Sequence, residues 1–195
     1  GSLSKATTRG NGVEGDVITQ NILHIKELPQ EIPANGFPDS LEIRGEIFME
    51  HDEFERINQH RVEKDLDLYA NPRNLTAGTV KLLDSREARK RKLKIVLYGL
   101  GACEPAGYFS SLSVFHEMIK DWGFPIVEFF SKVSSASEAW NKISELNQLR
   151  DSYTYPTDGA VIKLDSLVMQ ERAGSTAKAP RWAIAYKFES ERQET

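Results

Sequence analysis

Two lysines lie within apolar runs near the end of the sequence, Lys163 in "GAVIKLD" and Lys187 in "AIAYKFE". Both runs consist of the small, β-branched and aromatic residues that favour strands. Either lysine alone could lie at a strand edge, with its stem over apolar neighbours and its charge in water. For a single lysine this interpretation is about as good as a functional one. Two such strands together favour function, because two ammonium groups could converge on a phosphate and stabilise charge developing at phosphorus in a transition state.

A charged strand offers a second candidate site. In "SLEIRGEIFM" apolar and charged residues alternate, which predicts a strand over residues 41–49 with one apolar and one charged face. The charged face is either an ordinary solvated surface or the wall of a cleft, where Glu46 would accept hydrogen bonds from ribose hydroxyls or hold a metal's water. Gly45 favours the cleft, since a glycine inside a strand often marks close approach by a ligand.

Several basic residues are ambiguous. Arg9 in "TRGNG" and Arg73 in "NPRN" are either exposed loop arginines or guanidinium groups that reach a phosphate or a base. The run "SREARKRKLK" holds six basic residues in ten positions. It is either a solvated helix face or the best candidate for contact with a nucleic-acid backbone. No chemistry is assigned to four scattered residues, His24, His51, His60 and Cys103.

The elements that must position these side chains are both strands and helices. Helices are predicted over residues 50–62, with Asp52 as the cap, over residues 113–122, ended by Gly123, and over residues 134–150, where Ser135 and Glu138 have capping-box spacing. Residues 95–101 form a short apolar strand, and "YANPRNLTAGTVKLLD" is interpreted as a proline-bounded turn followed by an apolar run. The fold class is therefore α+β, with antiparallel strands and two or three helices packed on them.

Bulk composition limits the classes of function. The 195 residues, 39% of them hydrophobic, suit one domain or a domain and a half, and the net charge of −4 is not that of a general polyanion binder. A single cysteine excludes a disulfide framework within the chain and favours a cytoplasmic setting. No apolar run approaches the ~18 residues of a membrane span. Gly1-Ser2 is interpreted as a remnant of expression cloning.

Seven segments, in this order, resemble a known family: "TTRGNGVEGDVITQNI", "LEIRGEIF", "YANPRNLTAGTVKLLD", "YGLG", "WGFP", "DGAVIKLD" and "RAGSTAKAPRWAIAYKF". The family is the adenylation domain of bacterial NAD-dependent DNA ligases. The resemblance runs from about Leu3 to Phe188, and several of the segments are long and specific.

The resemblance implies an incomplete nucleotidyltransferase (ATP-grasp-like) core, with antiparallel sheets flanked by helices. In this family a lysine attacks the α-phosphorus of NAD, giving lysyl-AMP and releasing nicotinamide mononucleotide. The AMP then passes to the 5′-phosphate of nicked duplex DNA, and the 3′-hydroxyl displaces it to seal the nick in replication and repair. Mg²⁺ assists, and zinc is expected only in a C-terminal part of the parent enzyme.

The resemblance also implies roles for individual residues. Arg9 would contact the nucleotide, and Glu46 would bind the adenosine ribose or lie near Mg²⁺, although no metal ligand within the chain is assigned. Lys163 and Lys187 would contact the α-phosphate and help to expel the leaving group. Three more residues, Arg73, Lys81 and Arg150, would face DNA or phosphate.

The sequence departs from the family pattern in three places. Lys81 stands where arginine is expected, and Asn11 stands where aspartate is usual, which puts a metal role there in doubt. The family's nucleophilic lysine belongs to a K-x-D-G motif, which these 195 residues do not contain. We therefore expect residues 3–195 to be a partial adenylation domain, with K-x-D-G encoded upstream of Leu3, that cannot adenylate itself alone.

Two other functions stay open. One is an ATP-dependent polynucleotide ligase or a capping-type nucleotidyltransferase, against which the segments "NPRN" and "APRWAIAYKF" argue. The other is a non-catalytic DNA-binding module organised around the basic run from Arg86 to Lys94. The chain alone would be a monomer, or a dimer paired through an open sheet edge.

Overall fold

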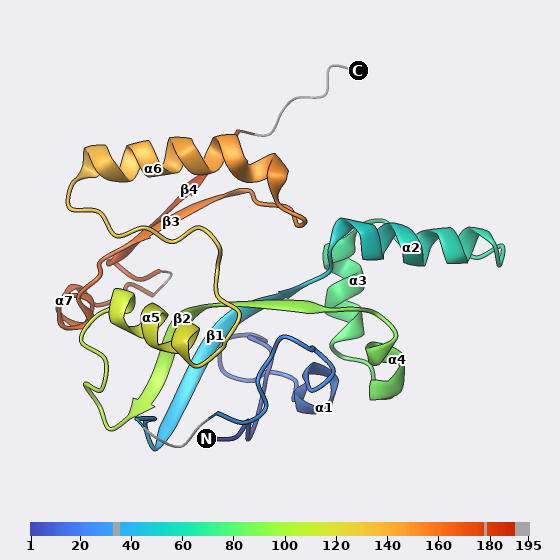
Figure 1. Cartoon of the computed structure of the whole chain (residues 1–195), viewed down its shortest axis with the longest axis horizontal. Coiled ribbons are helices and arrows are strands. Elements are labelled where there is room, and N and C mark those ends of the chain that lie inside the picture. The colour runs from blue at the N-terminus through green and yellow to red at the C-terminus, as the bar shows by residue number, and fades with distance from the viewer. Residues whose placement is uncertain (33–35, 178, 190–195) are drawn as a thin grey trace.

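The structure is a computed structural model that describes residues 1–32, 36–177 and 179–189. Within these ranges it contains seven α-helices, a short 3₁₀ helix and four strands, which form two separate antiparallel sheets of two strands each (Figure 1). The predicted mixture of helices and antiparallel strands is confirmed. The expected number of helices, two or three, is wrong because several short helices carry weak periodic signals.

The first sheet pairs β1 (Ser40–Phe48) with β2 (Lys94–Glu104). Leu41, Ile43 and Ile47 pack against the core, whereas Glu42, Arg44 and Glu46 are exposed. The alternation predicted over residues 41–49 is thus confirmed. Because one face of the sheet is packed and the other is charged, the charged face is available to line a site.

A bulge interrupts this sheet. Arg44 lies opposite Gly99 while Gly45 lies opposite Leu97, so Tyr98 has no partner residue on β1. A Cβ atom on Gly45 would lie 2.3 Å from the carbonyl oxygen of Val96. The close approach that Gly45 permits in this structure is therefore by the backbone of β2, and the approach of a ligand there stays a prediction.

The second sheet pairs β3 (Gly159–Lys163) with β4 (Ala183–Lys187). The helix α6 (Ala136–Leu149) lies over one face of this sheet (Figure 1), where the rings of Trp140 and Tyr186 meet edge to face at 5.3 Å. After β3 the chain forms α7 (Leu167–Ala173) before returning as β4. Both predicted lysine strands are confirmed.

The core lies beneath the first sheet. It is built from apolar side chains of the N-terminal segment with α1 (Thr19–Ile22), of β2, and of α5 (Leu112–Asp121). Phe115 and Ile119 of α5 are 0% exposed. The predicted apolar stripe is confirmed, and Gly123 after this helix has φ +84. The helix α5 is thereby fixed against β2.

The helix caps follow local sequence, with two departures from the predicted caps. In α6 the Ser135 hydroxyl accepts from Glu138 N at 3.1 Å as predicted, but the Glu138 carboxylate accepts from Ser134 N at 2.7 Å, one residue earlier than in a capping box. The helix α2 (His51–Val62) begins after Glu50, so Asp52 lies in the first turn and its prediction as cap is wrong.

The helix α3 (Pro72–Thr79) begins where a proline-bounded turn followed by an apolar run was predicted. The Asn71 side chain accepts from Asn74 N at 2.8 Å, and Pro72 occupies the first helical position. Asparagine before a proline is a helix start as readily as a turn, which is why the turn prediction is wrong here. The remaining short elements are α4 (Ser85–Arg89) and the 3₁₀ helix η1 (Arg150–Ser152).

None of the helices in the described part of the chain is long and apolar enough to cross a membrane.

Candidate nucleotide site

The two lysines lie at opposite ends of one face of the second sheet. Lys163 is opposite Ala183 and Lys187 is opposite Gly159, and directly opposed residues share a face. The two lysines are four residue positions apart along the strands, with three residue pairs between them, which corresponds to about 13 Å. The two lysines therefore do not lie side by side. They lie at the two ends of a sheet face that includes Val161. A single phosphate would be reached by both only through extension of their side chains along the sheet.

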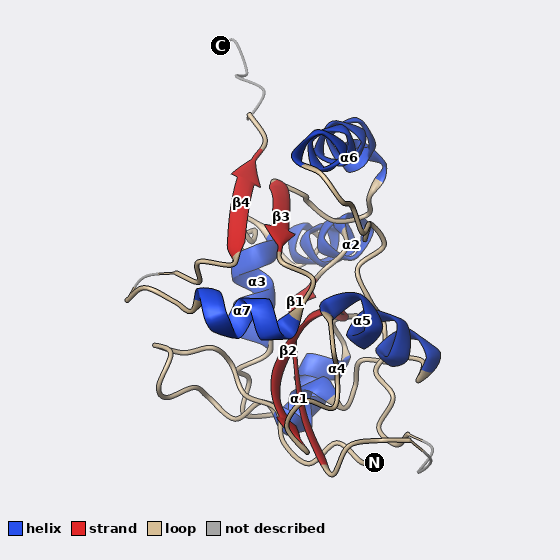
Figure 2. Cartoon of the chain, turned by 90° about the vertical axis from the view of Figure 1, so that its left-hand side faces the viewer, coloured by secondary structure: helices blue, strands red, loops and turns tan. Residues whose placement is uncertain are grey.

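Lys163 joins the two sheets. Its Nζ lies 5.2 Å from the centroid of the Tyr98 ring, which belongs to β2. Figure 2 shows the β3–β4 sheet above α7, β1 and β2. Lys163 is half-buried, and this burial lowers the pKa of its ammonium group below the ordinary lysine value. Lys187 at the other end is exposed.

A cavity of about 660 Å³ opens at this junction. Arg44 and Lys163 supply positive charge, and the aromatic rings of Tyr98, Tyr108 and Trp182 line the same space. Cationic groups beside flat aromatic faces suit a ligand that combines an aromatic base with a phosphate. The residues come from β1, β2, the loop after β2, β3 and the start of the return to β4.

Charges from β1 and from the N-terminal turn act on Tyr98. Burial raises the pKa of the Tyr98 phenol, the negative charge of Glu46 adds to this rise, and the positive charges of Arg9 and Arg44 oppose it. Arg9 and Glu46 themselves are exposed. Three of the predicted residues thus bear on Tyr98, which the sequence prediction did not name: Lys163 lies over its ring, and the charges of Arg9 and Glu46 act on its phenol.

The glycine-rich turn that carries Arg9 is closed by its own backbone. Thr8 N donates to Asp16 O at 2.9 Å, and Asn11 Oδ1 accepts from Glu14 N at 2.8 Å. Gly10 has φ +53, and a Cβ atom there would lie 1.7 Å from Glu14 O. The turn therefore requires glycine at this position. The Asn11 side chain serves to hold the turn.

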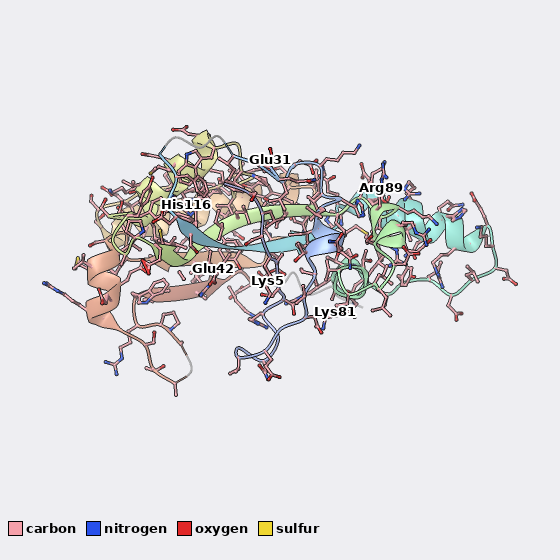
Figure 3. All side chains as sticks on the ribbon, turned by 90° about the horizontal axis from the view of Figure 1, so that it is seen from below. Lys5, Glu31, Glu42, Lys81, Arg89 and His116 are labelled. Atoms are coloured by element: carbon pink, nitrogen blue, oxygen red, sulfur yellow. The ribbon has the colours of Figure 1, made fainter. Side chains whose placement is uncertain are left out.

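Lys81 ties α3 to this turn. Its Nζ lies 2.7 Å from Asp16 Oδ2, and the hydrogen bond from Lys81 lowers the pKa of the Asp16 carboxyl. Figure 3 shows Lys81 beside the N-terminal segment. Both side chains of this pair are more than half exposed, so a phosphate could compete for the ammonium group.

Arg73 and Arg150 lie in different surroundings. Arg73 is exposed in the first turn of α3. Arg150 is mostly covered: its side chain is 19% exposed, it donates to Glu189 O at 3.2 Å, and it lies 5.9 Å from the centroid of the Phe188 ring. Tyr186 lines a second cavity of about 310 Å³ with Arg150, on the face of β4 opposite Lys187. The structure therefore does not bring Arg150 to the cavity of Lys163.

Nearby carboxylates neutralise part of the positive charge of the basic run at residues 86–94. Arg86 pairs with Asp84 at 2.8 Å, and Lys90 pairs with Glu87 at 2.6 Å. Lys94 pairs with Glu27. Arg91 donates to Thr79 Oγ1 at 2.7 Å and contributes to packing instead.

His116 is a further residue that the sequence prediction left out. It lies on α5, is 4% exposed, and places its Nε2 atom 3.2 Å from the carbonyl oxygen of Tyr98. Its position follows Leu112 and Phe115 and precedes Ile119, the i, i+3, i+4 and i+7 spacing of a buried helix stripe. That spacing could have identified His116 as buried, but nothing in the sequence indicates its partner.

Mg²⁺ in proteins is usually held by one or two carboxylates together with phosphates of the substrate. In the described ranges no three His, Cys, Asp or Glu side chains cluster so as to hold a metal ion.

The sequence of this chain is similar to those of known proteins. Residues 1–191 match the family described as NAD-dependent DNA ligase adenylation domain. A DNA ligase 1 from Opitutus terrae is 54% identical over 199 residues, which covers 100% of this chain and 30% of that protein. A DNA ligase from Thermodesulfovibrio yellowstonii is 40% identical over 189 residues, which covers 96% of this chain and 28% of that protein.

A DNA ligase from Akkermansia muciniphila is 41% identical over 195 residues, which covers 100% of this chain and 24% of that protein. The chain thus spans less than a third of the length of these relatives. Because the family match extends over nearly the whole sequence, the chain belongs to the NAD-dependent DNA ligase adenylation domain family.

Proposed function

We propose that this chain is part of an NAD-dependent DNA ligase and forms the AMP-binding part of its nucleotide site. The observation that carries the proposal is the half-buried Lys163, held over Tyr98 at a 660 Å³ cavity between the two sheets. The names of the relatives and the family support NAD and nicked duplex DNA as substrates. The two facing antiparallel sheets support a nucleotidyltransferase core, of which residues 3–195 would form a part. The bacterial cytoplasm, where NAD and DNA meet, would be its setting.

Each group around the cavity has a role in this proposal. The Tyr98 ring would offer the purine a flat aromatic surface. Lys163 and Lys187 would approach the phosphates from the two ends of the hairpin face. Glu46 would accept from the ribose hydroxyls, and Arg9 would contact the nucleotide from the glycine-rich turn. A partly buried ammonium group stabilises a phosphate more strongly than an exposed one, because water screens it less.

In the proposed reaction, a lysine outside these 195 residues attacks the α-phosphorus. A P–N bond forms, the P–O bond to nicotinamide mononucleotide breaks, and its electrons leave with that phosphate. Lys163 and Lys187 would offset the charge that develops on the phosphoryl and leaving oxygens. Arg73 and Lys81, both exposed, and the largely covered Arg150 are kept as the proposed contacts to DNA or phosphate.

Isothermal titration of the chain with AMP and with NAD tests the proposal. We expect binding of both, and Lys163→Met, which keeps the stem and removes the charge, should weaken it about tenfold or more. Lys142→Met is the matched control, because Lys142 is a lysine of α6 paired with Glu145 at 2.7 Å, and it should bind as the wild type does. Equal affinities of the wild type and Lys163→Met would overturn the assignment of Lys163.

Radiolabelled NAD with Mg²⁺ tests the missing nucleophile separately. Since the sequence contains no K-x-D-G, no stable labelled adduct should form on this chain. A labelled adduct that survives denaturation would show that another lysine is the nucleophile.

A further inference from the structure

The bulge in β2 leaves Tyr98 without a partner residue on β1, so the backbone of this residue needs another anchor. His116 supplies one, with Nε2 3.2 Å from the Tyr98 carbonyl oxygen. A carbonyl oxygen only accepts, so Nε2 must carry the proton and donate it. This contact therefore selects the Nε2–H tautomer of His116.

Packing fixes the His116 ring in the orientation that this hydrogen bond needs. The ring stacks on Phe130 with centroids 4.2 Å apart and planes 16° apart, and it meets Phe115 edge to face at 5.7 Å. The second ring nitrogen, Nδ1, is buried without a hydrogen-bond partner among the described residues. A side chain needed only to fill this space would be better apolar, because burying an unpaired nitrogen costs free energy. The donor at Nε2 is therefore the reason for a histidine here.

The same residue, Tyr98, connects this anchor to the cavity. Its backbone is held by α5 through His116, while its ring lies under Lys163 Nζ at 5.2 Å. We propose that His116 is a positioning residue, which holds the bulged Tyr98 so that the Tyr98 ring lines the nucleotide cavity beside Lys163. The inference rests on the proposed function, since it takes the cavity to be the nucleotide site.

The charges near His116 agree with a neutral donor. Burial lowers the pKa of His116, and the nearby positive charge of Lys163 lowers it further, against the opposing effect of the Tyr98 carbonyl. At neutral pH the ring therefore carries one proton, which the contact with Tyr98 O places on Nε2.

Two substitutions separate the hydrogen bond from packing. His116→Phe keeps a ring between Phe130 and Phe115 but removes the donor, whereas His116→Gln keeps an amide donor near the position of Nε2 and removes the ring. In titrations with AMP, His116→Phe should bind about two- to tenfold more weakly than the wild type, and His116→Gln should recover most of the affinity. His60→Phe is the control, because His60 lies exposed on α2, which projects from the body in Figure 1.

A role in packing alone predicts the reverse order, with His116→Phe close to the wild type and His116→Gln impaired. That order, or equal affinities for all of these proteins, would overturn the inference. Thermal unfolding of each variant shows that the proteins compared are folded. If neither substitution yields a folded chain, the tautomer of His116 in the wild type, described next, decides the question.

Two spectroscopic measurements require no nucleotide. Long-range ¹H–¹⁵N NMR of the histidine rings at neutral pH should show His116 as the Nε2–H tautomer, and an Nδ1–H tautomer would overturn the inference. With 3-fluorotyrosine labelling and assignment by Tyr98→Phe, the ¹⁹F signal of Tyr98 should shift in His116→Phe and return towards the wild-type position in His116→Gln. Failure of the wild type to bind AMP or NAD would reject the proposed function, while the tautomer and the ¹⁹F shift would still decide the role of His116.

Discussion

At the scale of single residues, two basic side chains, Lys163 and His116, lie close together. Lys163 is half-buried and His116 is buried. Burial lowers the pKa of Lys163 and of His116, and the charge of Lys163 adds to the effect on His116. Two positive charges in such a place would repel each other and would both lose hydration. A neutral His116 therefore allows Lys163 to keep its charge for a phosphate.

This arrangement makes stability depend on pH. The pKa of His116 is below its ordinary value of 6.5 in the folded chain, so the unfolded chain binds more protons between the two values. Unfolding free energy should fall as the pH drops from about 6.5 through the folded-state pKa of His116. Urea unfolding at pH 7.5 and at pH 5.5 measures this fall in unfolding free energy. Both pH values lie above the pKa values of most carboxyl groups.

His116→Gln is the comparison for this measurement, since it carries no titrating ring. The fall in stability between the two pH values should be smaller in His116→Gln than in the wild type. An identical fall in both proteins would show that other groups cause it.

The sequence predicted only part of this site. The two lysines stand out because charge within an apolar strand is visible in a single segment. Tyr98 and His116 do not, because their roles depend on a bulge and on the register between β1 and β2. A register is set by the packing of two strands that are distant in sequence, and local composition does not encode it.

At the scale of elements, local signals were reliable where a cap and an apolar stripe coincide. The helix α6 begins at a serine whose hydroxyl accepts from Glu138 N, and α5 ends before a glycine with positive φ, both as predicted. The helix α3 was missed because its start, Asn71-Pro72, is also a turn signal. The physical ambiguity lies in the dipeptide itself, and only packing of Leu75 into the core resolves it.

The cap of α6 can be tested directly. Ser135→Ala removes the acceptor for Glu138 N and should lower the free energy of unfolding by about 1 kcal/mol. Ser144→Ala is the matched control, since that hydroxyl donates back to Trp140 O within the helix at 3.1 Å, and its loss should cost little. Urea unfolding measures both, and equal effects would contradict the assignment of Ser135 as the cap.

At the scale of the whole molecule, the segment after β3 is joined to α5, the helix that packs against β2. Asp165 accepts from Ser113 N at 2.8 Å and from Ser113 Oγ at 2.9 Å, across 52 residues of sequence, and pairs with Lys132 at 2.7 Å. A second link connects Thr154 with Glu50 at 2.9 Å, across 104 residues. Such long-range links were not predictable, because each partner alone is an ordinary polar residue.

Of these two links, that of Asp165 is expected to contribute more to the free energy of unfolding. Burial alone would raise the pKa of Asp165, and the hydrogen bonds from Lys132 and Ser113 outweigh it, so the pKa is lowered. Its contribution is present above the ordinary aspartate pKa and is lost as the pH falls through the lowered value. At pH 7 Asp165→Asn, which keeps an acceptor but removes the charge, should lower the free energy of unfolding by about 1 kcal/mol.

Asp151→Asn serves as its control. The Asp151 side chain is 88% exposed and pairs with Arg150 at 3.6 Å, so its substitution should change stability little. Urea unfolding at pH 7 compares the two variants. If Asp165→Asn proved no more destabilising than Asp151→Asn, the link between the segment after β3 and α5 would not depend on that charge.

The placement of Lys163 and Lys187 at opposite ends of the sheet face also determines how dissolved salt would act on the site. Lys163 is half-buried at one end of the hairpin face, and Lys187 is exposed at the other. Mobile ions screen an exposed charge over a Debye length of about 8 Å at physiological ionic strength, but they reach a buried charge poorly. An anionic ligand held by both would therefore lose the attraction of Lys187 as ionic strength rises, while it keeps most of the attraction of Lys163.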